Sequence, residues 1–209
     1  MTEGATNRNR LSQWLFNPFK FVAGLQALVI GLAIILLSGY IGSLSNTHFD
    51  GVLDVHTGRS APVWFFLAEG TIDWVCLAVP LFFFGLIVSR SSFRFVDVIG
   101  TQALARWPYI IAAMVMFPDA NRRVPEYILS QITQGASTAT INSADVVVFG
   151  LVVIAAFLML IWMVELMYRA YSVSCNIKGA GAVITFIVSL IGAEVLSKFV
   201  IYLMFKQLK

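Results

Sequence analysis

The chain has 209 residues, of which 59% are apolar and 12% charged, and its mean hydropathy is +0.84. A soluble domain of this size cannot bury that much apolar surface, so the composition excludes an ordinary soluble protein. The net charge of +3 is small, and the basic residues lie at the ends of apolar runs. This pattern is typical of a membrane protein whose partners include membrane lipids, and it indicates no nucleic acid.

Residues 1–20 form a polar tail before the first long apolar run. The tail has no compact apolar core followed by a small-residue cleavage site, so we expect no cleaved signal peptide. Trp14, Phe16 and Phe19 stand near its end beside Lys20. Aromatic residues next to a basic residue predict a short amphipathic element at the membrane interface.

Five apolar segments follow, and each has the roughly 20 residues that a helix needs to cross the hydrocarbon core. The runs are continuous rather than alternating, and a helix satisfies its own backbone hydrogen bonds in lipid. The predicted fold is therefore all-α, a bundle of five transmembrane helices, in which Pro80 and Pro108 kink their helices. The spans form one membrane domain over 21–205, namely 21–44, 62–88, 95–117, 144–168 and 181–205.

The connections between these spans differ in length. Residues 45–61 predict a polar loop, whereas 89–94 are so few that spans two and three should form an antiparallel hairpin. The longest polar insert, 118–143, has room for a helical turn or more, and 169–180 predict another loop. Lys and Arg are more numerous on the amino-terminal side, which favours a cytoplasmic amino terminus, in the cytoplasmic (inner) membrane if the chain is bacterial.

Five charged residues lie well inside three of these spans. At about 1.5 Å of rise per residue, Asp73, Arg106 and Glu194 fall near the bilayer centre. Glu69 and Lys198 lie about a turn further out, each four residues from an acid on the same helix face. Because a central charge costs roughly 2.5–3.5 kcal/mol to insert, we expect all five to face protein or water as one buried polar network.

The acids outnumber the bases in this network. One carboxylate must then be protonated, solvated or shared with a bound cation. Two interpretations stay open. The network fixes helix packing, or it lines a polar cavity that binds a proton, a cation or a lipid headgroup.

The first polar loop contains a cluster of possible metal ligands, His48, Asp50, Asp54 and His56. Their spacing matches no known ligand pattern, and the sequence Asp50-Gly51 is ordinary turn chemistry. The prediction for this loop is therefore a solvated segment, with no metal or cofactor assigned.

The chain has no phosphate-cradling glycine loop, no HExxH, no Gly-x-Ser-x-Gly and no CxxC motif. We therefore assign no catalytic residues and expect a protein that is not an enzyme. Cys76 and Cys175 lie in different segments, so no disulfide framework is expected. Four glycines inside the spans are candidates for close helix contacts, namely Gly31, Gly39, Gly150 and Gly192.

Several short motifs follow one another in a recognisable order: Asn17-Pro18-Phe19-Lys20, Ser92-Phe93-Arg94, Val98-Ile99-Gly100, Ala105-Arg106-Trp107-Pro108 and Trp162-Met163-Val164-Glu165-Leu166. Over about residues 14–205 the layout resembles the Yip1-domain family of five-span membrane proteins, particularly its bacterial members. The resemblance implies a five-helix membrane fold with a cytosolic amino terminus. Eukaryotic members are linked to early secretory membranes, small GTPases and vesicle traffic. This chain departs from them because it lacks their long cytosolic tail, so trafficking is not carried over.

The expected function is a non-enzymatic membrane protein that organises the membrane or partner proteins, as a homo-oligomer or with protein partners. The alternative is a small transporter or ion-coupled permease that uses Asp73, Arg106 and Glu194. Five spans without matching halves count against the usual inverted-repeat transporter in one chain. A membrane enzyme acting on lipid is a third and weaker hypothesis.

Overall fold

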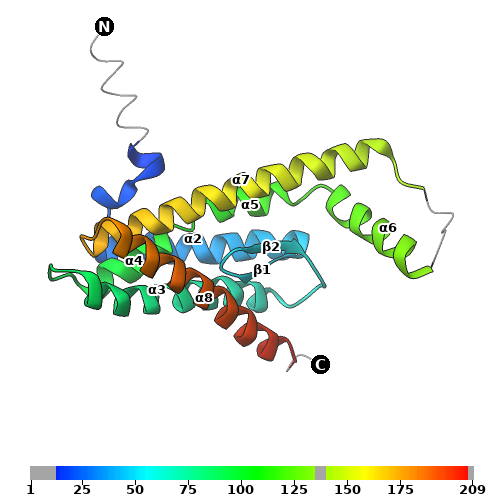
Figure 1. Cartoon of the computed structure of the whole chain (residues 1–209). Helices are drawn as coiled ribbons and strands as arrows, with labels where there is room; N and C mark the ends of the chain where they lie inside the picture. The colour runs from blue at the N-terminus through cyan, green and yellow to red at the C-terminus, as the bar shows by residue number, and fades with distance from the viewer. Residues whose placement is uncertain (1–12, 135–139, 207–209) are drawn as a thin grey trace, which may run out of the picture.

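The computed structural model describes residues 13–134 and 140–206. In this part of the chain, five helical segments are long and apolar enough to cross a membrane, which confirms the predicted all-α polytopic bundle. The chain runs back and forth along one axis, so the described amino-terminal and carboxy-terminal ends lie at opposite ends of the bundle (Figure 1). The elements are η1 (Pro18–Lys20), α2 (Gly24–Ser45), β1 (Thr47–Gly51), β2 (Asp54–Thr57), α3 (Val63–Val88), α4 (Phe95–Leu104), α5 (Pro108–Val115), α6 (Ala120–Gln134), α7 (Ser143–Ser174) and α8 (Ala180–Lys206).

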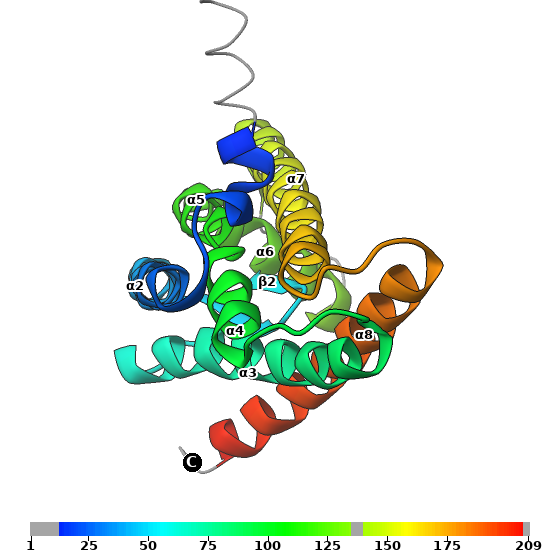
Figure 2. The same cartoon turned by 90° about the vertical axis from the view of Figure 1, so that its left-hand side faces the viewer.

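The third span forms the centre of the bundle. Seen along the bundle, α4 lies between α2, α3 and α7, and it packs against all three (Figure 2). The apolar window of Phe95–Val115 is 67% buried, against 33% or less for the other four spans. The other helices therefore keep most of their apolar surface on the outside, where a membrane would supply lipid.

The third span is not one kinked helix but two helices, α4 and α5. Pro108 begins α5, a position where its missing N–H is not needed. Just before it, the Arg106 amide donates to the Ala103 carbonyl at 3.2 Å, and the Trp107 amide donates to the Leu104 carbonyl at 3.3 Å. These short-range bonds tighten the end of α4 and leave Arg106 in a break at membrane depth. Irregular backbone is tolerated at this depth because it is buried in protein.

The contact between α2 and α4 depends on two glycines. A Cβ atom on Gly31 would lie 2.4 Å from the Leu104 nitrogen, and one on Gly100 would lie 2.5 Å from the Gly24 oxygen. Because both neighbours are backbone atoms, any larger residue would push the two helices apart.

Of the other three glycines predicted to lie at helix contacts, one does so and two do not. A Cβ on Gly39 would lie 2.8 Å from the Phe66 oxygen, so Gly39 allows α2 and α3 to approach closely. Gly150 and Gly192 have no atoms within 4 Å of such a Cβ, so the prediction of close contacts is wrong for these two glycines.

The predicted solvated loop after the first span is a β-hairpin packed into the bundle. Strands β1 and β2 pair antiparallel, with His48 opposite His56. Phe49 and Val52 are 1% and 0% exposed, and the Tyr109 hydroxyl donates to the Val52 carbonyl at 2.8 Å. The prediction of a solvated segment is wrong because these apolar side chains bury one face of the hairpin against the helices.

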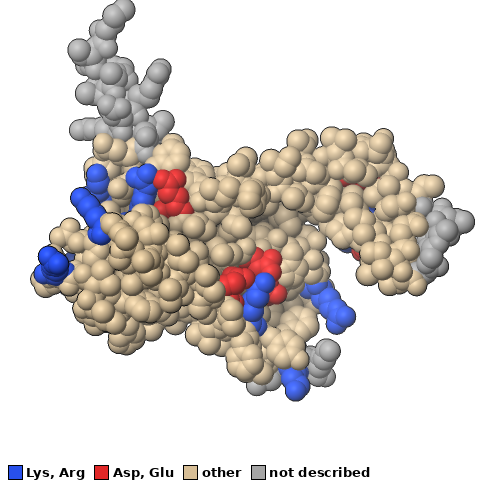
Figure 3. Space-filling view, viewed as in Figure 1, with Lys and Arg blue, Asp and Glu red and all other residues tan. Residues whose placement is uncertain are grey.

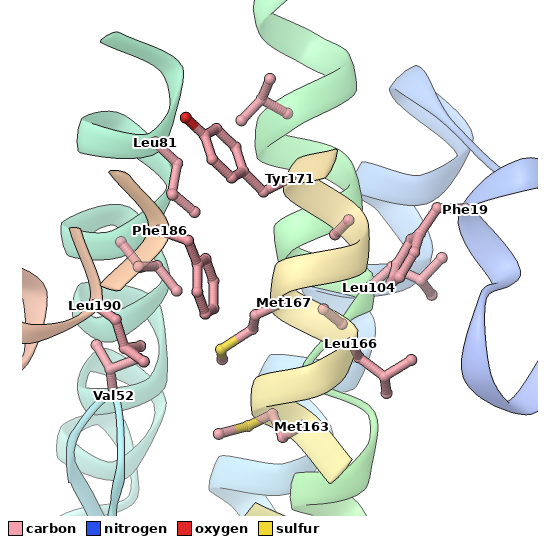
Figure 4. Close-up of a cluster of buried hydrophobic side chains, with 14 of the residues drawn as sticks. Phe19, Val52, Leu81, Leu104, Met163, Leu166, Met167, Tyr171, Phe186 and Leu190 are labelled. Carbon is pink, nitrogen blue, oxygen red and sulfur yellow. The ribbon is translucent and has the colours of Figure 1, made fainter. Parts of the chain in front are cut away.

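Helix α7 is only partly included in the bundle. Its carboxy-terminal half contributes a row of fully buried side chains, which meet α3, α8 and the hairpin in the core shown in Figure 4. Toward its other end, Leu151, Phe157 and Leu158 are all more than half exposed. Helix α7 also continues to Ser174, so it takes up part of the loop predicted at 169–180.

The segments at the two polar ends of the bundle also contain helices. The insert at 118–143 holds α6, whose Leu129 and Ile132 side chains are exposed. In the tail, Trp14 stacks on Phe21 at 5.0 Å, and the Trp162 indole donates to the Leu15 carbonyl at 3.3 Å. The rest of the predicted amphipathic tail, residues 1–12, lies outside the described residues.

Candidate functional site

The five predicted site residues come from three parts of the bundle. Glu69 and Asp73 lie on α3, Arg106 lies in the break between α4 and α5, and Glu194 and Lys198 lie on α8. Glu69 and Asp73 are completely buried and Arg106 is 1% exposed, whereas the Lys198 side chain is 46% exposed. The inner charges are thus shielded by protein, and Lys198 lies at the edge of the site.

The β-hairpin, rather than another helix, is the partner of Glu69. His48 Nδ1 donates to Glu69 Oε1 at 2.7 Å, and the Phe49 amide donates to the other carboxylate oxygen at 3.3 Å. The second ring nitrogen of His48 lies 2.8 Å from the Arg59 carbonyl oxygen. Both ring nitrogens therefore face acceptors, which requires the doubly protonated imidazolium form. Burial disfavours this charge, but the hydrogen bond and the negative charge of Glu69 outweigh burial, so the pKa of His48 is raised.

Glu194 binds the turn of the same hairpin. Its Oε2 atom accepts a hydrogen bond of 2.8 Å from the Leu53 amide. Lys198 donates to Asp54 at 2.7 Å and lies 3.2 Å from Glu194. Acidic and basic atoms accordingly adjoin in the middle of the face shown in Figure 3. A Cβ on Gly51 would lie 2.6 Å from a Glu194 carboxylate oxygen, so the turn fits closely against α8.

Asp73 and Arg106 form a separate pair deeper in the bundle. Neither Asp73 carboxylate oxygen has a hydrogen-bond partner among the described residues, and neither do the three guanidinium nitrogens of Arg106. The two charges are close enough to interact electrostatically. Arg106 also lies two residues beyond Leu104, the end of α4, where the helix dipole favours a positive charge. The structure thus brings the five predicted residues to one region but divides them into a hairpin-binding group and this deeper pair.

The hairpin carries a second group of charges, which lies beside a cleft at the surface of the bundle. Asp50 and His56 line this cleft of about 410 Å³, whose wall also includes His48 and Lys198, and Asp54 lies beside them. The carboxylates of Asp54 and Asp50 raise the pKa of His56, although burial opposes it. His56 and Lys198 hold the pKa of Asp54 well below its usual range, although burial opposes the shift.

Sequence reasoning did not include His48 and Tyr109 in the site, although each fixes the hairpin to a helix. A signal for the hairpin is present: polar His48, Asp50, Asp54 and His56 occupy alternate positions in their two short runs, and this period of two is typical of strands. No comparable signal identifies Tyr109, because its contact with Val52 joins residues far apart in the chain.

A second cleft, of about 440 Å³, lies between the hairpin, α6 and α7. Its wall is mostly apolar and includes Val55, Phe149 and Phe157. Neither Asp73 nor Arg106 lines this cleft or the cleft at His56. Neither of these two clefts therefore reaches Asp73 or Arg106.

The fold and this arrangement of charges define a multi-pass α-helical membrane protein. Compared with known proteins, the chain matches no family model, no curated protein and no solved structure.

Proposed function

We propose that the chain is a non-enzymatic membrane protein that organises the membrane or partner proteins around it. The resemblance to the Yip1-domain family is part of this proposal, and it implies the same five-span organisation. The amino terminus lies in the cytoplasm, as the distribution of basic residues favours. The β-hairpin then lies on the opposite side of the membrane, which is the cytoplasmic membrane if the chain is bacterial.

The observation that carries this proposal is the closure of the bundle by the hairpin. A transporter needs a hydrated path to its buried charges, whereas a structural domain seals them. Here Glu69 accepts from His48 and Phe49, and Glu194 accepts from Leu53, so the hairpin covers α3 and α8 around both acids. Buried acids whose oxygens are hydrogen-bonded in this way help to fix how the helices and the hairpin pack.

Self-association is the organising mode that the exterior supports. Helix α7 has 32 residues and would measure about 48 Å at about 1.5 Å per residue, which exceeds the roughly 30 Å hydrocarbon core. Its amino-terminal half exposes Val147, Leu151 and Ile154. A second copy of the chain covers this apolar face in the proposed oligomer.

One observation favours the alternative, a small ion-coupled permease. Asp73, Arg106 and Ser189 all have buried polar atoms without a hydrogen-bond partner among the described residues. Ionisable groups at membrane depth without hydrogen bonds are a common mark of an ion or proton pathway. In this alternative, Asp73 and Arg106 bind the ion after the hairpin has moved.

Both functions are tested by one reconstitution. The protein is labelled at Ser92→Cys, with Cys76 and Cys175 replaced by Ala, and energy transfer between copies is measured in liposomes diluted with lipid. Energy transfer that persists on dilution, together with no ion or proton flux, supports the organiser. Energy transfer that falls to the value of randomly distributed monomers, together with a flux abolished by Asp73→Asn, overturns it in favour of the permease.

A further inference from the structure

One face of the hairpin carries four residues of the types that bind metals. His48, Asp50, Asp54 and His56 occupy alternate positions on β1 and β2, and alternate residues of a strand point to the same side. The pairing of the strands is irregular between His48 and Gly51. Such an irregularity re-aims side chains. Three of the residues, Asp50, Asp54 and His56, each present a ligand atom, and these atoms lie within 4.8 Å of one another.

The two distances from His56 to the carboxylates are longer than good hydrogen bonds and match those of ligands around a common ion. His56 Nδ1 lies 3.5 Å from Asp50 Oδ1 and 3.6 Å from Asp54 Oδ1. A good N–H···O hydrogen bond has its heavy atoms about 2.7–3.2 Å apart. Ligand atoms bound at about 2.0–2.2 Å in a tetrahedral arrangement lie about 3.4 Å from each other.

Asp50 gives a second and independent indication. Its Oδ1 atom, the one that faces His56, is buried and has no hydrogen-bond partner among the described residues. A shielded carboxylate oxygen whose nearest basic atom is an imidazole nitrogen 3.5 Å away is only weakly satisfied. A cation bound beside Asp50 and His56 would satisfy it.

The neighbouring residues hold the trio in place. Asp54 Oδ2 accepts from Lys198 at 2.7 Å, which fixes the carboxylate and leaves Oδ1 directed at His56. The His48 ring, itself held by Glu69, stacks on the His56 ring at a centroid distance of 5.8 Å. Supporting contacts of this kind orient the residues that bind a metal directly. The charge of Lys198 opposes a second cation, so moderate rather than very tight affinity is expected.

We propose that Asp50, Asp54 and His56 bind a divalent transition-metal ion such as Zn²⁺, with water in the remaining coordination position. One imidazole and two carboxylates suit a borderline divalent ion, and three protein ligands leave an open position. The three side chains are 34–45% exposed, so water and the ion reach the site through the cleft at its edge. The inference does not depend on the proposed organising function.

The test uses the purified full chain in detergent, stripped of metal by a chelator and titrated with Zn²⁺ against a chromogenic competitor. We expect saturable binding of one ion per chain, at least about tenfold weaker in Asp50→Asn and in His56→Ala. The matched control is Asp119→Asn, which removes an exposed carboxylate paired with Arg123 and should leave the affinity unchanged.

A second measurement covers the case in which the hairpin variants do not fold. Co²⁺ added to the unmodified protein should give the visible absorption of a four-coordinate site and should be displaced by Zn²⁺. No saturable Zn²⁺ binding, no such absorption, or equal Zn²⁺ affinity in the folded His56→Ala protein would overturn the proposal.

Discussion

His48 of the β-hairpin and Glu69 of α3 are joined by a hydrogen bond of 2.7 Å that is almost completely shielded from solvent. The bond joins the segment after the first membrane span to the start of the second. The hairpin is therefore held to the helices by a charged contact in addition to its buried Phe49 and Val52. This contact makes the first loop part of the bundle.

Replacing Glu69 by Gln tests this contact. The variant leaves the His48 imidazolium buried without its counter-charge, and breaking a buried pair in this way costs about 3–5 kcal/mol. We expect a loss of that size in the free energy of unfolding, measured by denaturing-detergent titration. The control is Glu126→Gln, because Glu126 is exposed and lies 3.7 Å from exposed Arg122. Equal stability of the two variants would contradict the contact.

Tyr109→Phe tests the second attachment of the hairpin. The variant removes only the hydroxyl that donates to the Val52 carbonyl, and it leaves that buried carbonyl unsatisfied. We expect a loss of about 1–3 kcal/mol, measured in the same titration. Tyr40→Phe, at a tyrosine that is 51% exposed on α2, should change the stability little. A Tyr109→Phe protein as stable as the parent would show that the hairpin does not depend on this bond.

The close contact between α2 and α4 predicts that Gly→Ala substitutions at this contact lower stability much more than one elsewhere. Gly31→Ala and Gly100→Ala place a methyl group against backbone atoms, and overpacking of this kind typically costs about 1–3 kcal/mol. Gly192→Ala adds the same methyl group on α8, where no atom lies within 4 Å, and serves as the control. Thermal unfolding in detergent should rank the two contact variants well below the control. Three equal melting temperatures would be inconsistent with the helix packing.

Asp73 and Arg106 are expected to be energetically coupled. Arg106→Met alone leaves Asp73 buried without a nearby positive charge, and Asp73→Asn alone leaves Arg106 without a negative one. The double variant removes both penalties, so its destabilisation should fall short of the sum of the single effects by about 0.5–3 kcal/mol. A double-mutant cycle on the free energy of unfolding measures this difference. Strictly additive losses would mean that the two charges do not interact.

The helical architecture was predictable because hydrocarbon imposes it. Continuous apolar runs of sufficient length leave helices as the available structure, and the structure has five such segments. The break before Pro108 was predicted only as a kink, since the sequence does not show whether the chain continues as one helix beyond a proline. The close contacts at Gly31 and Gly39 and the open positions of Gly150 and Gly192 look alike in sequence, because only the neighbouring helix distinguishes them.

The burial of the inner charges was predictable, but their connections were not. The cost of charge in lipid explains why Glu69, Asp73 and Arg106 are buried inside the bundle. The matching depth of the charges on three spans suggested one network among the helices, whereas Glu69 and Glu194 bind the hairpin. The composition of the hairpin alone predicts a polar loop. The alternation of polar and other residues along its two strands is the signal that indicates a hairpin.

Closure of the bundle around the deep charges is tested most directly by cysteine accessibility. Single cysteines are placed at Leu77 and Leu190, which flank the Asp73 level on α3 and α8, in a background with Cys76 and Cys175 replaced by Ala. In membranes, no labelling by a water-soluble maleimide from either side is expected, because both positions are buried at 0% and 8% exposure. Rapid labelling of either cysteine in the folded protein would reveal a hydrated path to Asp73 and would contradict the closed bundle.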